Sequence, residues 1–585
     1  MKIKIQYTLF LLLFVAGVQT AISQKKEENI GTEVVNVVKP YTPTISDAFK
    51  VKETPALEDD DNTKKEVIKY SIFSFPVAST FAPSKGRAAG VDKSAAETLY
   101  KNYVIGGVGN YLTLFGELYV TENIGDNDYV SGMVKHLSSQ GGIKEVASKD
   151  SYLNSAIDLT YGSKQAEFAW NTDLGFQTQR YYWYGLPANY GSGFFTTQQQ
   201  STVYEKINEG ITYNNFYAAG KIKFNESIFN GLSLKYNRFW DGYNSAENRF
   251  IAKPSLKFDI QNTTIKTTFI ADYVGGEFKN NTLVPFKYGF ANFAVQPSFA
   301  MQRDDWSFNF GASVFYSLDT ENTNNKIFIY PNATASLKVV GDLMVFYLGA
   351  EGGLEQNSYR EFTNINPFVS PTLFVAPTDK QYDLYAGLKG KLSNYVSYNV
   401  KASLVSEKNK PLFVSNPFDE FKLEQESYQY GNSFGVVYDD LKTVNFSGEL
   451  KADFSKNISV GINGAFHKYT TTFQEEAWNL PEIEFGANLS VTITPKWYAS
   501  AAVFFVGERK DKYVRTNILP LVPQNNTQIL NSYFDANAQV GYKFSPRFGA
   551  FLKLNNLANQ SYQKWINYPV QSFQVMLGGS YKFDF

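Results

Sequence analysis

The sequence contains no cysteine among its 585 residues. This excludes a disulfide framework, a thiolate metal site and a lipid-modified cysteine. Its two histidines, His136 and His467, lie far apart, so a histidine-rich metal site is not expected. The net charge of -1 provides none of the concentrated basic surface that nucleic acid requires. We therefore predict neither a cofactor, nor a metal, nor a nucleic-acid partner.

Long apolar runs are also lacking, apart from one near the start of the sequence. Lys2 and Lys4 precede an apolar stretch from about Thr8 to Val18, and Ala21 and Ser23 fit a small-residue cleavage site. We therefore expect residues 1–23 to be a signal peptide. No later stretch approaches the 18 apolar residues of a membrane-spanning helix. The protein should thus be exported, as a periplasmic, secreted or outer-membrane protein.

Residues 24–100 differ in composition from the rest of the chain. They contain several prolines and the acidic run at 58–61. Such composition favours an extended, weakly ordered chain. We predict a flexible periplasmic segment here.

From about residue 101 the sequence alternates with a period of two. In "WSFNFGASVFYSL" (306–318) every second residue is apolar, and "TVNFSGELKADF" (443–454) and "IEFGANLSVTI" (483–493) repeat this pattern. The intervening residues are mostly Asn, Ser, Thr, Gln, Lys, Glu and Gly, which suits a hydrated lumen. Aromatic residues make up 16% of the chain, and aromatic belts are typical of membrane interfaces. The pattern predicts an all-β fold: one antiparallel transmembrane β-barrel over residues 101–585, with about 22 strands (20–24). A soluble β-solenoid or a set of sandwiches is the alternative.

Connections between these segments alternate in length. Short turns, such as "FSKN" (454–457) and "SPR" (545–547), alternate with longer polar loops near 185–210, 357–377, 407–428 and 508–530. Outer-membrane barrels have short periplasmic turns and long external loops, so the last strand should end in the periplasm. We expect its aromatic residues to serve recognition by the outer-membrane assembly machinery; they are Phe573, Tyr581, Phe583 and Phe585.

The stretch 533–585 resembles the end of TonB-dependent outer-membrane receptors. The similarity lies in "LKLNNLANQSY" and the closing aromatic strand. "GNYLTLFGELYV" and "KHLSSQGG" near the barrel start look like plug-less receptor-type barrels of the Bacteroidota. The resemblance implies a transport or ligand-binding receptor in the outer membrane. Such receptors carry a plug domain before the barrel, and residues 24–100 look too short and too polar to be one. Inward-folded loops, the N-terminal segment or another protein should then fill the lumen.

One stretch of the N-terminal segment, "TEVVNVVKPYTP" (32–43), resembles the box through which such receptors recruit TonB. Its extended part, Glu33, Val34, Val35 and Val37, could add as a strand to a periplasmic partner. The alternative is an ordinary linker.

Two further motifs are candidates for function. The aromatic run Tyr181, Tyr182, Trp183 and Tyr184 is a candidate ligand contact in an external loop, with an interfacial aromatic girdle as the alternative. His136 stands beside Ser138 and Ser139, a pairing that outer-membrane lipases and acyltransferases use. Adjacent residues on a strand do not establish a triad, so we expect a luminal or interfacial histidine.

Together these observations predict a non-enzymatic barrel of the outer membrane of a Gram-negative cell. It should act in transport or ligand binding, or as a scaffold for a periplasmic or surface protein partner. A passive porin-like channel is the alternative, and a barrel enzyme is a third class.

Overall fold

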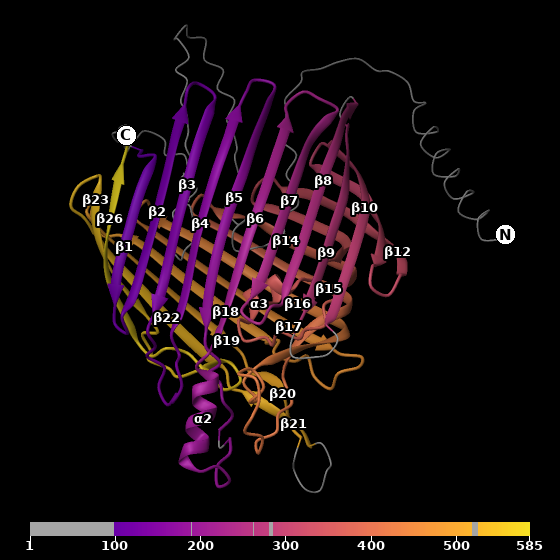
Figure 1. The fold of residues 1–585 in the computed structure, drawn as a ribbon. Coiled ribbons are helices and arrows are strands. Elements are labelled where there is room, and N and C mark those ends of the chain that lie inside the picture. Colours follow the sequence, from indigo (N-terminus) through magenta and orange to yellow (C-terminus); the bar gives the residue numbers. More distant parts are fainter. Residues whose placement is uncertain (1–98, 189, 261–262, 280–284, 517–523) are drawn as a thin grey trace, which may run out of the picture. The chain divides into compact units, whose positions relative to one another are not determined.

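The computed structural model describes residues 99–188, 190–260, 263–279, 285–516 and 524–585, which form a closed antiparallel β-barrel of 22 strands (Figure 1). The predicted fold class is therefore confirmed. The predicted signal peptide (1–23) and nearly all of the predicted segment 24–100 lie outside the described residues. Both stay predictions.

The barrel strands follow one another around the wall in chain order. They are β1 (Asn102–Gly109), β2 (Thr113–Ile124), β3 (Asp128–Ser139), β4 (Tyr152–Lys164), β5 (Phe168–Tyr181), β6 (Ile211–Phe224), β7 (Phe229–Asp241), β8 (Ala246–Ile260), β9 (Thr263–Phe278), β10 (Phe286–Arg303), β11 (Trp306–Asp319), β12 (Asn324–Val340), β13 (Met344–Glu355), β14 (Thr378–Ser393), β15 (Val396–Ser415), β16 (Phe434–Ser455), β17 (Ile458–Thr470), β18 (Ile483–Thr492), β19 (Trp497–Val506), β22 (Tyr533–Lys543), β23 (Phe548–Asn555) and β26 (Gln574–Phe583).

The barrel closes where the first strand pairs with the last. The register runs from Asn102 opposite Phe583 to Gly109 opposite Met576. On its other side β26 pairs with β23, where Tyr581 lies opposite Phe548. Closure removes the unpaired sheet edge, which hydrocarbon could not solvate. Of the predicted terminal aromatics, Tyr581 and Phe583 lie in this strand, Phe573 directly precedes it, and Phe585 follows its end by two residues.

The two ends of the barrel differ in their connections (Figure 1). Turns of two to four residues, such as 456–457 and 493–496, join strands at the end where β26 finishes. Longer loops, including 140–151, 182–210, 356–377, 416–433, 507–532 and 556–573, lie at the opposite end. The predicted alternation is confirmed, but the loop predicted near 407–428 begins later. Strand β15 continues to Ser415 because residues 410–415 pair with 434–439 of β16.

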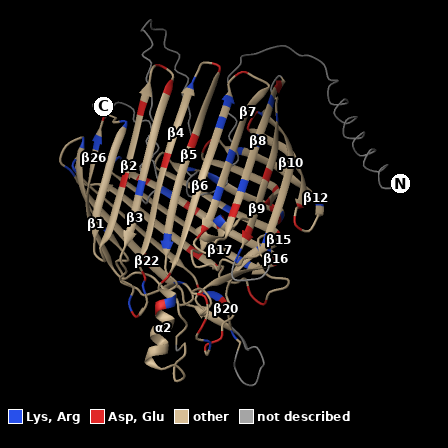
Figure 2. Ribbon diagram, viewed as in Figure 1, with Lys and Arg blue, Asp and Glu red and all other residues tan. Residues whose placement is uncertain are grey.

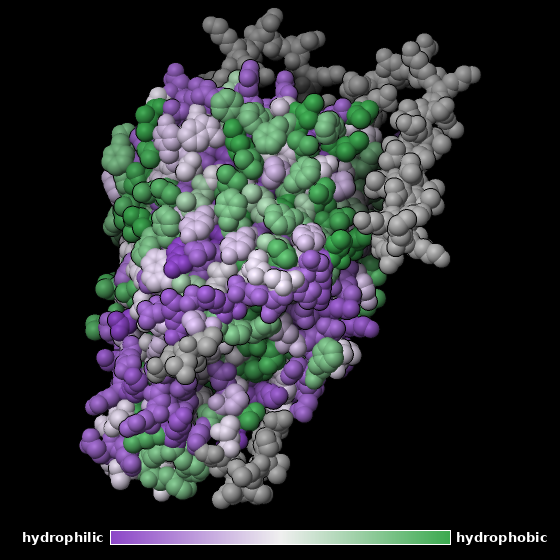
Figure 3. Space-filling model, turned by 45° about the vertical axis from the view of Figure 1, so that its right-hand side comes forward, coloured by the Kyte–Doolittle hydropathy of each residue, from purple (hydrophilic) through white to green (hydrophobic). Residues whose placement is uncertain are grey.

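The outer surface of the barrel carries the apolar side chains predicted from the alternation. Phe310, Phe446 and Leu577 are 50%, 55% and 62% exposed. Figure 3 shows apolar residues gathered toward the short-turn end and hydrophilic residues toward the long-loop end of one outer face. Such an apolar band requires hydrocarbon around it, because water would leave it unstable.

The luminal wall is polar and charged. Lysines and acidic residues occur along many of the strands (Figure 2). Several luminal lysines lie over tyrosine rings of a neighbouring strand; Lys401 Nζ is 4.1 Å from the centre of the Tyr385 ring and Lys235 Nζ 5.1 Å from that of Tyr217. The rings hold these long cations against the wall.

Helices occur only in the long loops of the described chain. Helix α2 (Thr197–Ile207) lies between β5 and β6, and α3 (Tyr359–Ile365) between β13 and β14. Two small hairpins, β20 (Arg509–Arg515) with β21 (Gln524–Leu530) and β24 (Gln563–Trp565) with β25 (Tyr568–Pro569), lie in the last two loops. Within the described residues, no helix has the length and apolar character needed to cross a membrane.

Tyrosine rings cover glycines on neighbouring strands of the wall. A Cβ atom added at Gly387 would collide with the ring of Tyr347 and lie 2.5 Å from the carbonyl oxygen of Val400. Backbone cannot move aside as a side chain can, so an added methyl group strains the wall.

We therefore expect Gly387→Ala to destabilise the barrel by about 1–3 kcal/mol, the usual cost of overpacking. The measurement is the midpoint of heat unfolding, read as the loss of the compact band of unboiled protein on gels. Gly220→Ala is the matched control, because its new Cβ would meet only the Asn171 carbonyl oxygen at 3.9 Å. Equal midpoints for both variants would contradict the packing argument.

Candidate functional site

Five long loops meet in one hydrophobic core across the long-loop end of the barrel. The core joins loop side chains to side chains of the wall, including Tyr213 and Phe239. Its buried loop members are Trp183, Tyr190, Val203, Ile207, Tyr359, Phe362, Phe368, Val369, Leu373, Val375, Ala376, Phe418, Tyr428, Tyr430, Leu530, Trp565, Ile566 and Tyr568. We call this set the loop core. Its loop members pack against wall residues of β9 and β10 as well, so the core extends across the mouth.

Hydrogen bonds connect the same loops to one another. Asn432 Nδ2 donates to the Trp183 carbonyl oxygen at 2.9 Å, and the Tyr568 hydroxyl donates to the Asn432 carbonyl oxygen at 2.5 Å. The Arg509 guanidinium donates to the carbonyl oxygens of Lys564 and Gln563. Four loops are thereby tied in one layer.

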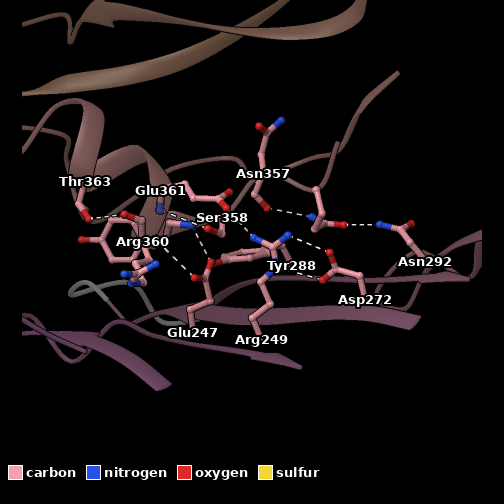
Figure 4. Close-up of polar contacts among 12 residues, drawn as sticks. Glu247, Arg249, Asp272, Tyr288, Asn292, Asn357, Ser358, Arg360, Glu361 and Thr363 are labelled. Carbon is pink, nitrogen blue, oxygen red and sulfur yellow. Dashed lines mark hydrogen bonds and ion pairs between the residues drawn. The ribbon is translucent and has the colours of Figure 1, made fainter. Parts of the chain in front are cut away.

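Helix α3 is docked against the inner wall by its first residues (Figure 4). The backbone N–H groups of Tyr359 and Arg360 donate to the Glu247 carboxylate at 2.6 and 3.4 Å, and the Tyr288 hydroxyl donates to the same carboxylate. A carboxylate here satisfies unpaired donors of the helix and complements its dipole. The Tyr359 hydroxyl donates to Asp241 at 2.8 Å. Burial raises the pKa of this hydroxyl, which keeps it a neutral donor.

Arg249 is the second anchor of α3. Its guanidinium makes two parallel hydrogen bonds to Asp272, at 2.9 and 2.8 Å, and a third bond of 2.7 Å to Glu361 of the helix. The paired geometry holds the arginine rigidly to the wall. Glu361 thus links the helix to the ion pair of Arg249 with Asp272, which joins strands β8 and β9.

The residues that precede α3 are held by hydrogen bonds of side-chain amides, not by ion pairs. Asn292 of the wall donates to Gln356 at 2.6 Å, and Asn357 donates to the Ala376 carbonyl oxygen at 2.7 Å. Both ends of the loop 356–377 are thereby joined to one another and to the wall; the bond from Asn292 is seen in Figure 4.

A cavity of about 910 Å³ lies inside the barrel beside α3. Its lining combines charged groups, including Arg249, Lys253 and Glu355, with apolar groups of the loop core, including Phe362 and Trp565. A pocket with a few charged groups among apolar surface suits an amphipathic or polar ligand.

The four aromatic residues predicted to contact ligand lie in or beside the loop core. Trp183 is fully buried, and its ring packs 6.3 Å from that of Tyr428. Tyr184 contacts the rings of Phe368 and Tyr568, Tyr181 contacts Phe368, and Tyr182 is buried. Their role as ligand contacts stays a prediction. Access to Trp183 requires the loops to move.

The other predicted binding residues are Glu33, Val34, Val35 and Val37, which lie outside the described residues. The sequence did not reveal the anchors Glu247, Arg249 and Asp272. They occupy polar positions in strands whose residues alternate between polar and apolar, as many other residues of the barrel do. The helix residues that Glu247 and Arg249 bind lie 112 residues away, so no local pattern distinguishes these anchors. Within the described chain, no group of three or more His, Asp or Glu side chains could hold a metal ion.

No protein-family model matches the sequence, and no curated protein matches it. Solved structures do match. The ferric-catecholate import receptor Fiu from E. coli K12 matches with a TM-score of 0.59 and 10% identity, over 83% of this chain and 82% of that one. The FrpB iron transporter from Neisseria meningitidis matches with a TM-score of 0.59 and 11% identity, over 82% and 81%. The ferripyoverdine receptor of Pseudomonas aeruginosa matches with a TM-score of 0.59 and 11% identity, over 84% and 72%.

The closed barrel and its apolar outer band therefore define an outer-membrane β-barrel. Its fold is similar to that of the 22-stranded barrels of TonB-dependent receptors, as the sequence resemblance implied.

Asp511 of hairpin β20–β21 is a buried carboxylate of the loop layer. It accepts a hydrogen bond from the Ser415 backbone at 2.9 Å. Burial outweighs this bond and raises the pKa of Asp511 to about 6. An unfolded aspartate ionises near pH 3.9. Between these values the folded hairpin binds more protons than the unfolded one, so its stability falls as pH rises through this window and is constant above it.

We expect the hairpin to be more stable at pH 4 than at pH 7.5, by on the order of 3 kcal/mol. Hydrogen exchange of residues 509–515, corrected for the intrinsic pH dependence, measures this difference. Asp511→Asn should abolish it, and Asp126→Asn in an exposed short turn should preserve it. A pH-independent hairpin in the unsubstituted protein would contradict the expected burial of charge.

Proposed function

We propose that this protein is a gated outer-membrane receptor or transporter that binds a ligand and admits it through its own loops. The barrel would serve as the passage and the loop core as its gate. The observation that carries the proposal is the loop core, in which side chains from five loops meet across the mouth. A passive channel needs a permanently open mouth, and this arrangement disfavours one.

The anchors of α3 support a gate of two parts. The wall supplies a rigid half, because Arg249 and Asp272 remain paired with each other whether or not the helix is present. The helix supplies the mobile half, held by Glu361 on Arg249 and by its first N–H groups on Glu247. A ligand that competes for Arg249 or Glu247 would release the helix without disturbing the wall.

The luminal cavity supports a binding step within the barrel. Arg249 lines this cavity as well as anchoring α3. A ligand bound there would meet the same guanidinium that holds the gate. Binding and opening are thus coupled through one residue.

The names of the structural neighbours agree with this proposal. They are an import receptor, an iron transporter and a ferripyoverdine receptor. At 10–11% identity these neighbours support the barrel as a transport scaffold and leave the ligand open. The proposed transport requires no chemical reaction.

Purified full-length protein in planar bilayers should therefore show little steady conductance. Arg249→Met should raise it, because the substitution frees Glu361 and leaves Asp272 unpaired, a loss of about 3–5 kcal/mol for a buried pair. Arg303→Met, at the exposed end of β10 beside a short turn, is the matched control and should stay closed. Large steady conductance of the unsubstituted protein would support the porin alternative instead.

We further propose that residues 33–37 recruit a periplasmic partner, TonB being one candidate, by adding as a strand to its sheet. Main-chain pairing with apolar contacts from Val34, Val35 and Val37 would give such a complex its affinity.

Affinity purification from mild detergent should then recover a stoichiometric periplasmic protein. Deletion of residues 24–90 and the double substitution Val34→Asp, Val35→Asp should both abolish recovery. The control Val77→Asp, a single valine-to-aspartate substitution elsewhere in the segment, should leave recovery of the partner unchanged. Unchanged recovery after the deletion would remove this role from the segment.

A further inference from the structure

Three polar side chains form a hydrogen-bonded chain on the outer wall of the barrel. Nε2 of His136 is 3.0 Å from Oγ of Ser138, and its Nδ1 is 2.8 Å from Oγ of Ser155. His136 and Ser138 belong to β3, and Ser155 lies directly opposite His136 on β4. The histidine thus bridges a hydroxyl on its own strand and one on the next.

These side chains face outward, toward the bilayer. On β3 they share a face with Val130 and Val134, which are exposed apolar residues. Ser155 shares a face of β4 with the exposed Ile157 and Leu159. The alternation of strand side chains therefore excludes the lumen for all three.

The chain lies at the edge of the apolar band; Ser138 itself is only 8% exposed, and an open notch lies beside His136. Leu114, opposite Ser138 on β2, is half exposed, so apolar surface reaches this level. Gly116 stands opposite His136, and a Cβ added there would meet nothing within 4 Å. The missing side chain leaves room beside the imidazole for an acyl chain.

Two cationic side chains, Arg180 and Lys149, lie on the same side of the barrel. Arg180 faces outward on β5, opposite Leu153, which in turn lies opposite Ser138. Two strand spacings place its backbone about 10 Å from that of Ser138. The guanidinium of Arg180 and Nζ of Lys149 lie 5.3 and 5.9 Å from the centre of the Tyr182 ring. Two cations on one ring suit an anionic lipid headgroup.

We propose that His136, Ser138 and Ser155 form a serine acyl-hydrolase site whose substrate is the carboxylic ester of a membrane lipid. The arrangement contains a nucleophile, a base and a group that orients the base, all within hydrogen-bond reach. With its Nδ1–H donating to Ser155, the imidazole presents the lone pair of Nε2 to the Ser138 hydroxyl. This activity is separate from the proposed transport function.

The reaction divides into two steps. Ser138 Oγ attacks the ester carbonyl carbon as its proton passes to His136 Nε2; the bond to the lipid alkoxide then breaks, and the alkoxide takes that proton. Water next attacks the carbonyl carbon of the acyl-serine as its proton passes to His136 Nε2; the bond between the acyl carbon and Ser138 Oγ then breaks, and His136 returns the proton to Oγ. The sum is ester and water to carboxylic acid and alcohol.

Ser155 is a positioning residue, because it touches the histidine and not the substrate. A neutral hydroxyl fixes the tautomer and ring orientation but stabilises the imidazolium less than a carboxylate would. Ser155→Ala should therefore lower kcat with little change in KM. Ser155→Asn should restore much of the rate, because its amide oxygen also accepts from Nδ1–H.

The test uses full-length protein in vesicles, with two lipid arms. One contains glycerophospholipid alone, and the other adds lipid A. The readouts are fatty-acid release and covalent labelling by a fluorophosphonate that carries an alkyl chain. We expect release in at least one arm, which identifies the lipid class, and labelling at Ser138. Ser138→Ala and His136→Ala should each lower release by about 100-fold or more.

Ser131→Ala and His467→Ala are matched controls. Ser131 lies on the luminal face of β3 and is hydrogen-bonded to Thr121. His467 lies on the luminal face of β17 and is hydrogen-bonded to Asn445. Both should retain full release. The Ser138→Ala and His136→Ala variants should remain compact and heat-stable, so that a loss of fatty-acid release cannot be attributed to misfolding. Absence of release in both arms, or labelling unchanged by Ser138→Ala, would overturn the proposal.

Discussion

Closure of the sheet by the β1–β26 pair is the constraint on which the rest of this structure depends. In hydrocarbon every backbone N–H and C=O needs a partner within the chain, and only a closed antiparallel barrel gives each strand two neighbours. An even strand count follows when both ends of the sheet finish on the same side, and it divides the connections into short turns and long loops. The long loops are thereby gathered at one end, where they have the length to pack together.

The wide lumen that results is closed at one end by ordinary globular packing. The wall offers charged groups such as Arg249 and Glu247, and the loops offer a short helix and an aromatic core. Apolar contacts and hydrogen bonds hold loop to loop, whereas the contacts of α3 with the wall also include the ionic bond of Glu361 with Arg249. The two kinds of contact respond differently to a charged ligand, because the ionic contacts can be exchanged for contacts to the ligand and the apolar ones cannot.

The fold was predictable from the sequence because lipid imposes a pattern on every strand. Exposed residues such as Phe310, Phe446 and Leu577 recur at every second position, and turns such as 493–496 mark the strand ends. The loops carry no such periodic signal. The burial of Trp183, the docking of Glu361 on Arg249 and the contact of Ser155 with His136 all join segments whose proximity only the barrel register determines. Even the start of the loop after β15 was misplaced, because its strand continues beyond the band in which alternation is informative.

The membership of the loop core has a consequence for biogenesis. Trp565, Ile566 and Tyr568 belong to the last connection of the chain, between β23 and β26, and they pack against residues from connections made much earlier. A barrel in which this last connection has not yet folded therefore lacks part of the loop core. The loop core can therefore form completely only after the connection between β23 and β26 is in place. A barrel whose assembly stops before that point would leave an open pore in the outer membrane.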